Sequence, residues 1–425
     1  MIDPKRIVEL WDRPPFGLVN GQGFHLMTGP QAHEVAVGPV HAGVIEPGHF
    51  RFQCLGEDVR NLEISLGYQH RGAERLIVEA ESDVRRLAIA QTVAGDTSVA
   101  ATLACSAALQ TGKEGQTCFA GMNAVWRLLL ELERIANHVG DLGALAGDVA
   151  YLPTASFCGR IRGEYLNMTA LFTGNRFGRV LSPADLPSVG SPAYEAKMDR
   201  FMPWFLRTRR ECLHALDLLF SESSAVERFE GTGVVSEADA RAVGMVGVAA
   251  RASGVTDTMG GWPVVGGGDV LARARQRYEE IREAHARIER LLVSLPGRTT
   301  GEGDAESLPC QNEDPDSIFS EGRDSSAPGT DAALRVHELP QEDGSLIRIA
   351  IVDAWRGELV HAARFVPSGS GSDGPGASLR LADYRVFDPS YFNWFGLSLA
   401  LRGEQISNFP TCNKSFNLSY CGVDR

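Results

Sequence analysis

The chain has 425 residues, of which 44% are hydrophobic and 22% are charged, as is ordinary for a globular protein with a sizeable core. Its 54 acidic residues outnumber the 41 basic residues, and the formal net charge of -13 disfavours a nucleic acid as the partner. No apolar run approaches the roughly 20 residues that span a bilayer, and the first residues form no apolar signal-peptide core, so we expect an intracellular protein.

In chain order, residues 1–33 are interpreted as an N-terminal extension, and the first predicted element is a small antiparallel sheet over residues 34–64. There, apolar and polar residues alternate between Gly and Pro breaks. Residues 87–109 are mostly Ala, Leu, Val and Thr, which indicates one helix buried on most sides. Apolar residues recur at helical spacing over residues 122–140 and 278–295, and they predict two long core helices.

The C-terminal third contains two segments that cannot bury much apolar surface. Residues 296–330 are rich in Gly, Ser, Pro and acidic residues, and we expect a disordered acidic insertion on the surface. Residues 367–377 are rich in Gly and Ser, and we expect a flexible loop between β-like runs. These runs cover residues 346–353, 358–365 and 378–386.

The predicted fold class is therefore α+β and mainly helical. It combines a helical bundle with a small N-terminal β-sheet and a C-terminal β hairpin region. Residues 34–425 are expected to form one domain that includes the insertion and the loop.

Eight short blocks in a fixed order carry a family resemblance. They are Gly38–Phe52, Leu66–Arg75, Glu131–His138, Thr173–Gly178, Arg228–Gly233, Ala250–Gly254, Arg356–Glu358 and Asp388–Ser390. Together they resemble the 49-kDa subunit of respiratory complex I, the NADH-quinone oxidoreductase. They also resemble the large subunit of membrane-bound nickel-iron hydrogenases of the hydrogenase-4 and formate hydrogenlyase type. The resemblance covers most of the chain and implies a hydrogenase large-subunit-like helical bundle.

In these hydrogenases, four cysteine thiolates hold nickel and iron. The resemblance places the four positions at Ala94, Thr97, Ser419 and Gly422, and none of them is a cysteine. A serine hydroxyl is too hard a ligand to replace a bridging thiolate on a soft metal. We therefore expect a member that lacks the nickel ligands and binds no metal. The chain stops at Arg425, near the end of processed hydrogenase large subunits, and we expect no tail to be removed.

Three ionisable residues are candidates for proton transfer. Glu46 matches the family's proton-passing glutamate, and its apolar neighbours would raise its pKa by desolvation. The alternative is that Glu46 caps a turn or pairs with Arg51. Asp96 lies in the loop where complex I relatives place a quinone-binding tyrosine, and together with His49 it would protonate a reduced quinone. The alternative for Asp96 is a turn or helix cap before Thr97.

His70 and Arg71 fall where the family approaches the iron-sulfur cluster of a partner subunit. An arginine there would stabilise the reduced cluster. The histidines, including His138, show no metal-binding spacing, and we interpret them as hydrogen-bonded core groups. Glu131 and Glu133 are interpreted as ion-pair partners of nearby arginines rather than as an acid-base couple.

The resemblance implies three partners: an iron-sulfur small subunit, a 30-kDa-type subunit and membrane-arm subunits. The chain itself is expected to bind no cofactor; a 4Fe-4S cluster would lie in the partner, and a quinone or similar acceptor would bind between them. No dinucleotide-binding glycine motif follows a strand, so any link to NAD would run through another subunit. The expected location is cytoplasmic, at the inner face of the cell membrane.

Three functions remain open. The first is a nickel-free large subunit of a complex I-related or hydrogenase-4-like electron-transfer complex. The second is an active nickel-iron hydrogenase, which the missing ligands disfavour. The third is a scaffold of the complex that does no chemistry.

Overall fold

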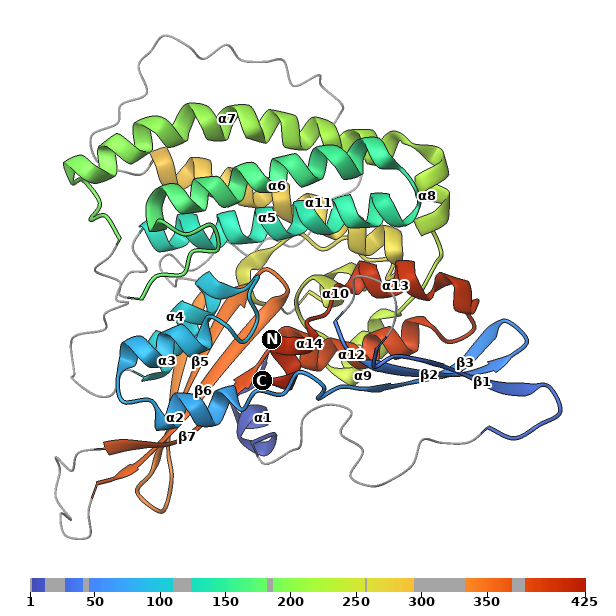
Figure 1. Ribbon diagram of the computed structural model, residues 1–425, viewed down its shortest axis with the longest axis horizontal. Coiled ribbons are helices and arrows are strands. Elements are labelled where there is room, and N and C mark those ends of the chain that lie inside the picture. The colour runs from blue at the N-terminus through green and yellow to red at the C-terminus, as the bar shows by residue number, and fades with distance from the viewer. Residues whose placement is uncertain are drawn as a thin grey trace.

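The computed structural model describes residues 2–11, 27–40, 46–109, 124–181, 186–256, 258–293, 333–368 and 379–425. A layer of long helices lies above a layer that contains two sheets and the shorter helices (Figure 1). The α+β, mainly helical prediction is confirmed. Within the described part of the chain, no helix has both the length and the apolar character needed to cross a membrane.

The upper layer is a bundle of four long helices: α5 (Ala124–Asp148), α6 (Leu152–Thr173), α7 (Pro192–Ser221) and α11 (Val270–Val293). Helix α5 packs against both α6 and α11, and α6 packs against α7. Gly143 of α5 allows close approach to α6, because a Cβ atom there would lie 2.6 Å from the Cβ atom of Cys158.

The two predicted core helices are confirmed as α5 and α11. Residues 122–123 and 294–295, at the edges of those predictions, lie outside the described residues.

The prediction of one helix over residues 87–109 is wrong. Helix α3 (Asp83–Ala90) ends before a turn, and α4 (Ser98–Leu109) begins after it. The guanidinium of Arg71 donates hydrogen bonds to the carbonyl oxygens of Thr92 and Val93, at 2.8 and 2.9 Å. Side-chain contacts of this kind satisfy carbonyl groups that a continuous helix would otherwise use. The break leaves residues 91–97 as a loop between the two helices.

Two antiparallel sheets complete the framework. The three-stranded sheet has the order β1-β2-β3 and confirms the prediction for residues 34–64. The four-stranded sheet has the order β4-β5-β6-β7 and confirms the three predicted runs. Its edge strand β4 had not been predicted. The strands are β1 (Ala32–Val37), β2 (His49–Leu55), β3 (Asp58–Ser65), β4 (Leu334–Pro340), β5 (Leu346–Ala354), β6 (Gly357–Pro367) and β7 (Leu379–Phe387).

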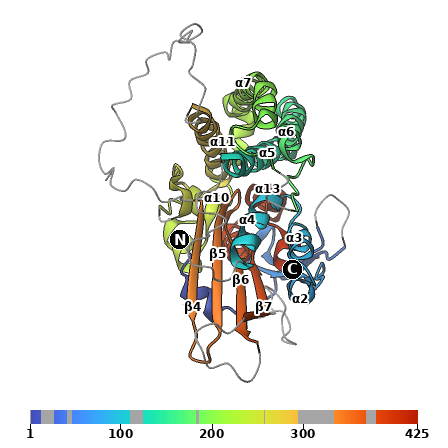
Figure 2. The ribbon, with the colours of Figure 1, turned by 90° about the vertical axis from the view of Figure 1, so that its left-hand side faces the viewer.

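The four-stranded sheet is covered on both faces below the bundle (Figure 2). Helix α4 packs on strands β5 and β6, against side chains such as Val352. Ile349 and Ile351 point to the opposite face and contact a second apolar cluster that includes α1 (Pro4–Glu9). Alternate residues of β5 therefore belong to different cores, as the period of two in a strand requires.

Short helices link these parts. They are α2 (Ala73–Glu79), α8 (Ser223–Phe229), α9 (Glu237–Val243), α10 (Gly247–Ala252), α12 (Pro389–Ala400), α13 (Phe409–Phe416) and α14 (Tyr420–Asp424), with 3-10 turns at Met259–Gly261 and Ile406–Asn408. The predicted acidic insertion at residues 296–330 lies outside the described residues, as do most of the loop at 367–377 and residues 12–26 of the proposed extension.

Candidate functional site

The last residues of the chain dock on the loop formed by residues 66–72. The Asp424 carboxylate accepts hydrogen bonds from the backbone N–H groups of Gly67 and Gln69, at 2.6 and 2.8 Å. The Nδ1 atom of His70 lies 2.7 Å from the carbonyl oxygen of Asp424. A carbonyl oxygen only accepts, so His70 carries its proton on Nδ1 in this contact. The ring holds the C-terminal helix α14 in place.

Arg71 joins this loop to the loop at residues 91–97. Its backbone N–H donates to the carbonyl oxygen of Arg425 at 3.0 Å, and its guanidinium binds the carbonyl oxygens of Thr92 and Val93. The side chain is exposed. The structure thus brings His70 and Arg71 to one edge of the molecule, where they bridge segments that lie far apart in the sequence.

The four positions that the resemblance assigns to the hydrogenase cysteines are occupied by small, buried residues. Ala94 and Thr97 lie in and just after the turn before α4, and both are at most 5% exposed. The Thr97 hydroxyl donates to Asp96 at 3.0 Å, and it accepts from the indole N–H of Trp355 at 3.2 Å. The Ser419 hydroxyl caps α14 by accepting from the backbone N–H of Gly422 at 2.9 Å.

Arg356 connects the two halves of this region. Its guanidinium forms a two-point ion pair with Asp96, at 2.7 and 2.9 Å, and its Nε atom donates to the carbonyl oxygen of Asn417 at 2.7 Å. Burial opposes ionisation of Asp96, but the charge and hydrogen bonds of Arg356 and a hydrogen bond from Thr97 outweigh it and lower the pKa. Asp96 is therefore an anion at neutral pH and a weak proton donor.

A carboxylate occupies the space beside Gly422. A Cβ atom built on Gly422 would lie 2.6 Å from Oδ2 of Asp388 and 2.8 Å from the Ser419 hydroxyl. Asp388 is 2% exposed, and its Oδ1 atom caps α12 by accepting from the backbone N–H of Ser390 at 2.8 Å. Burial raises the pKa of Asp388, although Arg356 and Ser390 partly offset it. A cysteine at position 422 would have to displace this carboxylate.

Glu46 contacts the same helix. Its carboxylate accepts from the backbone N–H of Cys421 at 2.9 Å and lies 3.8 Å from the Cys421 thiol. This contact caps the first turn of α14, in agreement with the capping alternative, whereas Arg51 forms an ion pair with Glu34. Burial, together with the nearby Glu46, Asp96 and Asp388 carboxylates, raises the pKa of the Cys421 thiol to about 11. The thiol is therefore neutral at pH 7.

His49 lies at the start of β2, and its Nδ1 atom is 3.1 Å from the carbonyl oxygen of Gly38. The strongest contact of Asp96 is with Arg356. The geometry thus gives each residue of the proposed His49/Asp96 pair a structural contact of its own.

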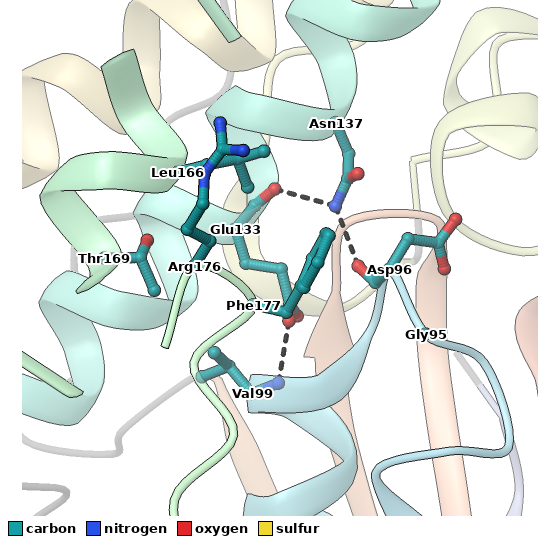
Figure 3. A pocket seen from close by; sticks show the side chains of 9 residues that line it. All are labelled: Gly95, Asp96, Val99, Glu133, Asn137, Leu166, Thr169, Arg176 and Phe177. Carbon is teal, nitrogen blue, oxygen red and sulfur yellow. Dashed lines mark hydrogen bonds between the residues drawn. The ribbon is translucent and has the colours of Figure 1, made fainter. Parts of the chain in front are cut away.

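Sequence reasoning missed the role of Glu133. Its carboxylate accepts from the backbone N–H groups of Val99 and Ala100, at 2.7 and 3.3 Å, and so caps the first turn of α4 (Figure 3). Burial raises the pKa of Glu133 to about 8 despite these hydrogen bonds, and Asp96 adds to the rise. Its neighbour Glu131 pairs with Arg134 at 3.3 Å, as expected. The spacing of Glu133 on the apolar stripe of α5 was a signal of burial.

Two pockets adjoin at Asp96 and Asn137. The Asn137 amide donates to the carbonyl oxygens of Asp96 and Glu133, at 2.8 and 2.9 Å, and holds the 91–97 loop against α5 (Figure 3). The smaller pocket is lined by Glu133 and has room for about one water molecule. The larger has a volume of about 400 Å³, and Arg162 and Asn417 also line it. Its size falls in the range of small-molecule sites.

A buried ionic network lies behind these pockets. Glu280 of α11 pairs with Arg251 at 2.7 Å and with the Nε2 atom of His138 at 3.1 Å. Burial lowers the pKa of His138, and its contact with Glu280 only partly offsets this. Its partner is a carboxylate, which fits the interpretation of His138 as a hydrogen-bonded core group. No group of three or more metal-binding side chains occurs among the residues that the structure describes.

Comparisons with known proteins agree with the resemblance. The family described as the 49 Kd subunit of respiratory-chain NADH dehydrogenase matches residues 148–259. The chain is 24% identical over 406 residues to formate hydrogenlyase subunit 5 of Escherichia coli, with 92% of this chain and 63% of that protein covered. The chain therefore spans less than two thirds of the length of that relative.

Two further relatives represent the other branches. Membrane-bound hydrogenase subunit alpha of Pyrococcus furiosus is 24% identical over 419 residues, with 92% of this chain and 87% of that protein covered. A NADH-quinone oxidoreductase subunit of Herpetosiphon aurantiacus is 28% identical over 274 residues, with 60% of this chain and 63% of that protein covered. The chain is therefore similar both to the 49-kDa subunit of respiratory-chain NADH dehydrogenase and to the large subunits of membrane-bound hydrogenases.

Proposed function

We propose that this chain is the nickel-free large subunit of a complex I-related or hydrogenase-4-like membrane electron-transfer complex. With an iron-sulfur subunit it forms the site where electrons reach a quinone or similar acceptor. The observation that carries the proposal is the packing around Gly422, because the carboxylate of Asp388 fills the place where a metal ligand would begin. A nickel-iron centre does not fit the residues present.

The acceptor site in this proposal is the pocket of about 400 Å³ that ends at Asp96. The exposed edge at His70 and Arg71 would face the cluster-bearing partner, and the positive charge of Arg71 would favour the reduced cluster. Glu46, at 3.8 Å from the half-buried Cys421 thiol, would supply protons beside α14. The Cys421 thiol that Glu46 contacts is neutral at pH 7 and adds no charge beside the Glu46 carboxylate.

Metal analysis tests the loss of nickel. The complex purified with this chain should contain iron from the partner's cluster and no nickel, as measured by plasma mass spectrometry. Near-stoichiometric nickel in the complex would overturn the assignment and revive the hydrogenase alternative.

A pocket block separates an acceptor site from a scaffold. Gly159 lines the pocket, and nothing lies within 4 Å of a Cβ atom added there. Gly159→Leu should therefore obstruct the pocket without disturbing the helix, whereas Gly159→Ala should leave most of the space open. Acceptor reduction by membranes that contain the assembled complex should fall at least tenfold in the Leu variant only. Equal turnover in both variants, with the complex intact, would favour the scaffold.

The proton role of Glu46 needs its own variant. Glu46→Gln retains an oxygen that can accept from Cys421 but removes the ionisable group. Glu57→Gln, at an exposed position beside β2, is the matched control. We expect slower acceptor reduction in the first variant alone, and unchanged turnover would remove Glu46 from the mechanism.

A further inference from the structure

We infer that the pocket of about 400 Å³ binds a small organic carboxylate, which pairs with Arg162. The inference goes beyond the proposed function, because it names an anionic ligand that would compete with a quinone for the same pocket. It starts from the walls of the pocket, which are made where α5 and α6 cross. Three glycines line the pocket, Gly140, Gly143 and Gly159. Arg162 and Cys158 lie over the first two, whereas nothing lies within 4 Å of a Cβ position at Gly159, so the pocket is open to a ligand on that side.

The position of Arg162 is fixed by one of these glycines. A Cβ atom at Gly140 would lie 2.9 Å from Cδ and 3.0 Å from Nε of Arg162, so the arginine side chain lies directly over the backbone of α5. Arg162 is half-buried and lines the pocket. Gly140 thus gives a guanidinium a defined place beside a cavity.

Arg162 has no carboxylate partner among the described residues. In this respect it differs from three buried arginines of the same region. Arg251 pairs with Glu280, Arg277 with Asp141, and Arg356 with Asp96. A half-buried guanidinium without a carboxylate partner beside a cavity can bind an anion through two N–H groups that the protein does not pair with a carboxylate.

The acids that line the pocket do not cancel this charge. Asp96 is neutralised by Arg356, and Asp141 is held by Arg277 at 2.8 Å and by the Asn417 amide at 2.5 Å. The wall of the pocket therefore carries a net positive charge, which comes from the guanidinium of Arg162.

Two exposed arginines lie at or near the adjoining small pocket. Arg176 lines the adjoining small pocket, and an Nη atom of Arg179 lies 3.4 Å from the Cβ position of Gly95. Neither has a carboxylate partner in the described ranges. A local positive field on a chain with a net charge of -13 would draw a small anion to this opening.

The class of ligand follows from these contacts. A neutral molecule would displace the water that hydrates the Arg162 guanidinium and supply no anion in its place. This loss of hydration costs free energy. A carboxylate offers two coplanar oxygen atoms that match the guanidinium fork. The amide groups of Asn137 and Asn417 already donate to protein oxygens, so each retains a carbonyl oxygen that can accept from a ligand hydroxyl. Hydroxycarboxylates should therefore bind more tightly than plain carboxylates.

Binding can be measured on the full chain by calorimetry at constant ionic strength. The probes are malate, succinate and inorganic phosphate, with sodium chloride as the reference. We expect malate to bind more tightly than succinate, and Arg162→Gln to weaken both at least tenfold, with partial recovery in Arg162→Lys. The matched control is Arg160→Gln, because Arg160 lies on the same helix but pairs with Glu211 at 2.6 Å. It should bind like the native chain.

Each other outcome overturns the inference. No carboxylate binding, equal binding by Arg162→Gln, or phosphate binding without carboxylate binding would each contradict it, as would an effect that chloride reproduces. The test needs no electron transfer. Carboxylate binding to a complex that reduces no acceptor would contradict only the proposed function, whereas quinone reduction with no carboxylate binding would contradict only this inference.

Discussion

Gly422→Ala should destabilise the protein by about 2–4 kcal/mol, because the added Cβ atom has no room. It would lie 2.6 Å from Oδ2 of Asp388 and 2.8 Å from the Ser419 hydroxyl. Both neighbours are held in place as helix caps, Asp388 by the N–H of Ser390 and Ser419 by the N–H of Gly422. Overpacking costs about 1–3 kcal/mol, and loosening one cap costs about 1 kcal/mol more.

The free energy of unfolding should be measured by urea titration, with Gly159→Ala as the control. Nothing lies within 4 Å of a Cβ atom at Gly159, which is inside helix α6. Alanine there should leave stability unchanged or raise it by up to about 1 kcal/mol. Asp388→Ala should reduce the cost of the Gly422 substitution, because it removes the nearest clash. Equal urea midpoints for the two alanine variants would refute this account of the Gly422 site.

Three further predictions concern charged groups. Burial raises the pKa of Glu133 in the folded protein to about 8, from an ordinary value of 4.5. Between these pH values the folded protein holds a proton that the unfolded chain has released. The free energy of unfolding should therefore fall as pH rises from about 4.5 to about 8. Glu133→Gln should flatten that decline in urea midpoints from pH 5 to 9, and an unchanged slope would contradict it. Asp96→Asn should lower the free energy of unfolding by about 1–3 kcal/mol. This is less than the 3–5 kcal/mol that breaking a fully buried ion pair costs, because the Asp96 side chain is 33% exposed. An unchanged melting temperature would show that Arg356 does not need Asp96 as its partner. Arg71→Met should lower the midpoint potential of the partner's cluster in a redox titration while the complex stays assembled, and an unshifted potential would remove the proposed interface.

The framework of the fold could be predicted from local patterns, because long amphipathic helices and alternating strands are recognisable by their period. The apolar spacing on α5 and the alternation on β5 were sufficient for this. The break between α3 and α4 was not visible, because the carbonyl groups there are satisfied by Arg71, about 20 residues earlier in the chain. The edge strand β4 was missed because it follows a long stretch without apolar periodicity.

The candidate site was predictable only in its positions. Ordered sequence blocks identified the loops that meet, including Ala94, Thr97, Ser419 and Gly422. They could not show what fills the space, because its main contacts join separate segments of the chain: Arg356 reaches Asp96, Glu46 reaches Cys421, and Asp388 lies beside Gly422. The open, positively charged side of the pocket was missed because Arg162 and Gly140 become neighbours only when α5 and α6 pack.

These contacts also hold the two loops together. The guanidinium of Arg356 binds Asp96 on one side and the carbonyl oxygen of Asn417 on the other, and so ties the start of α4 to the C-terminal segment. Asp388 caps α12, and Ser419 caps α14, the helix that contains Gly422. A cross-link made of one ion pair and two caps fixes geometry but keeps its charges inside the protein. The pocket beside it therefore presents the charge of Arg162 alone, and this makes the electrostatics of the cavity sensitive to a single side chain.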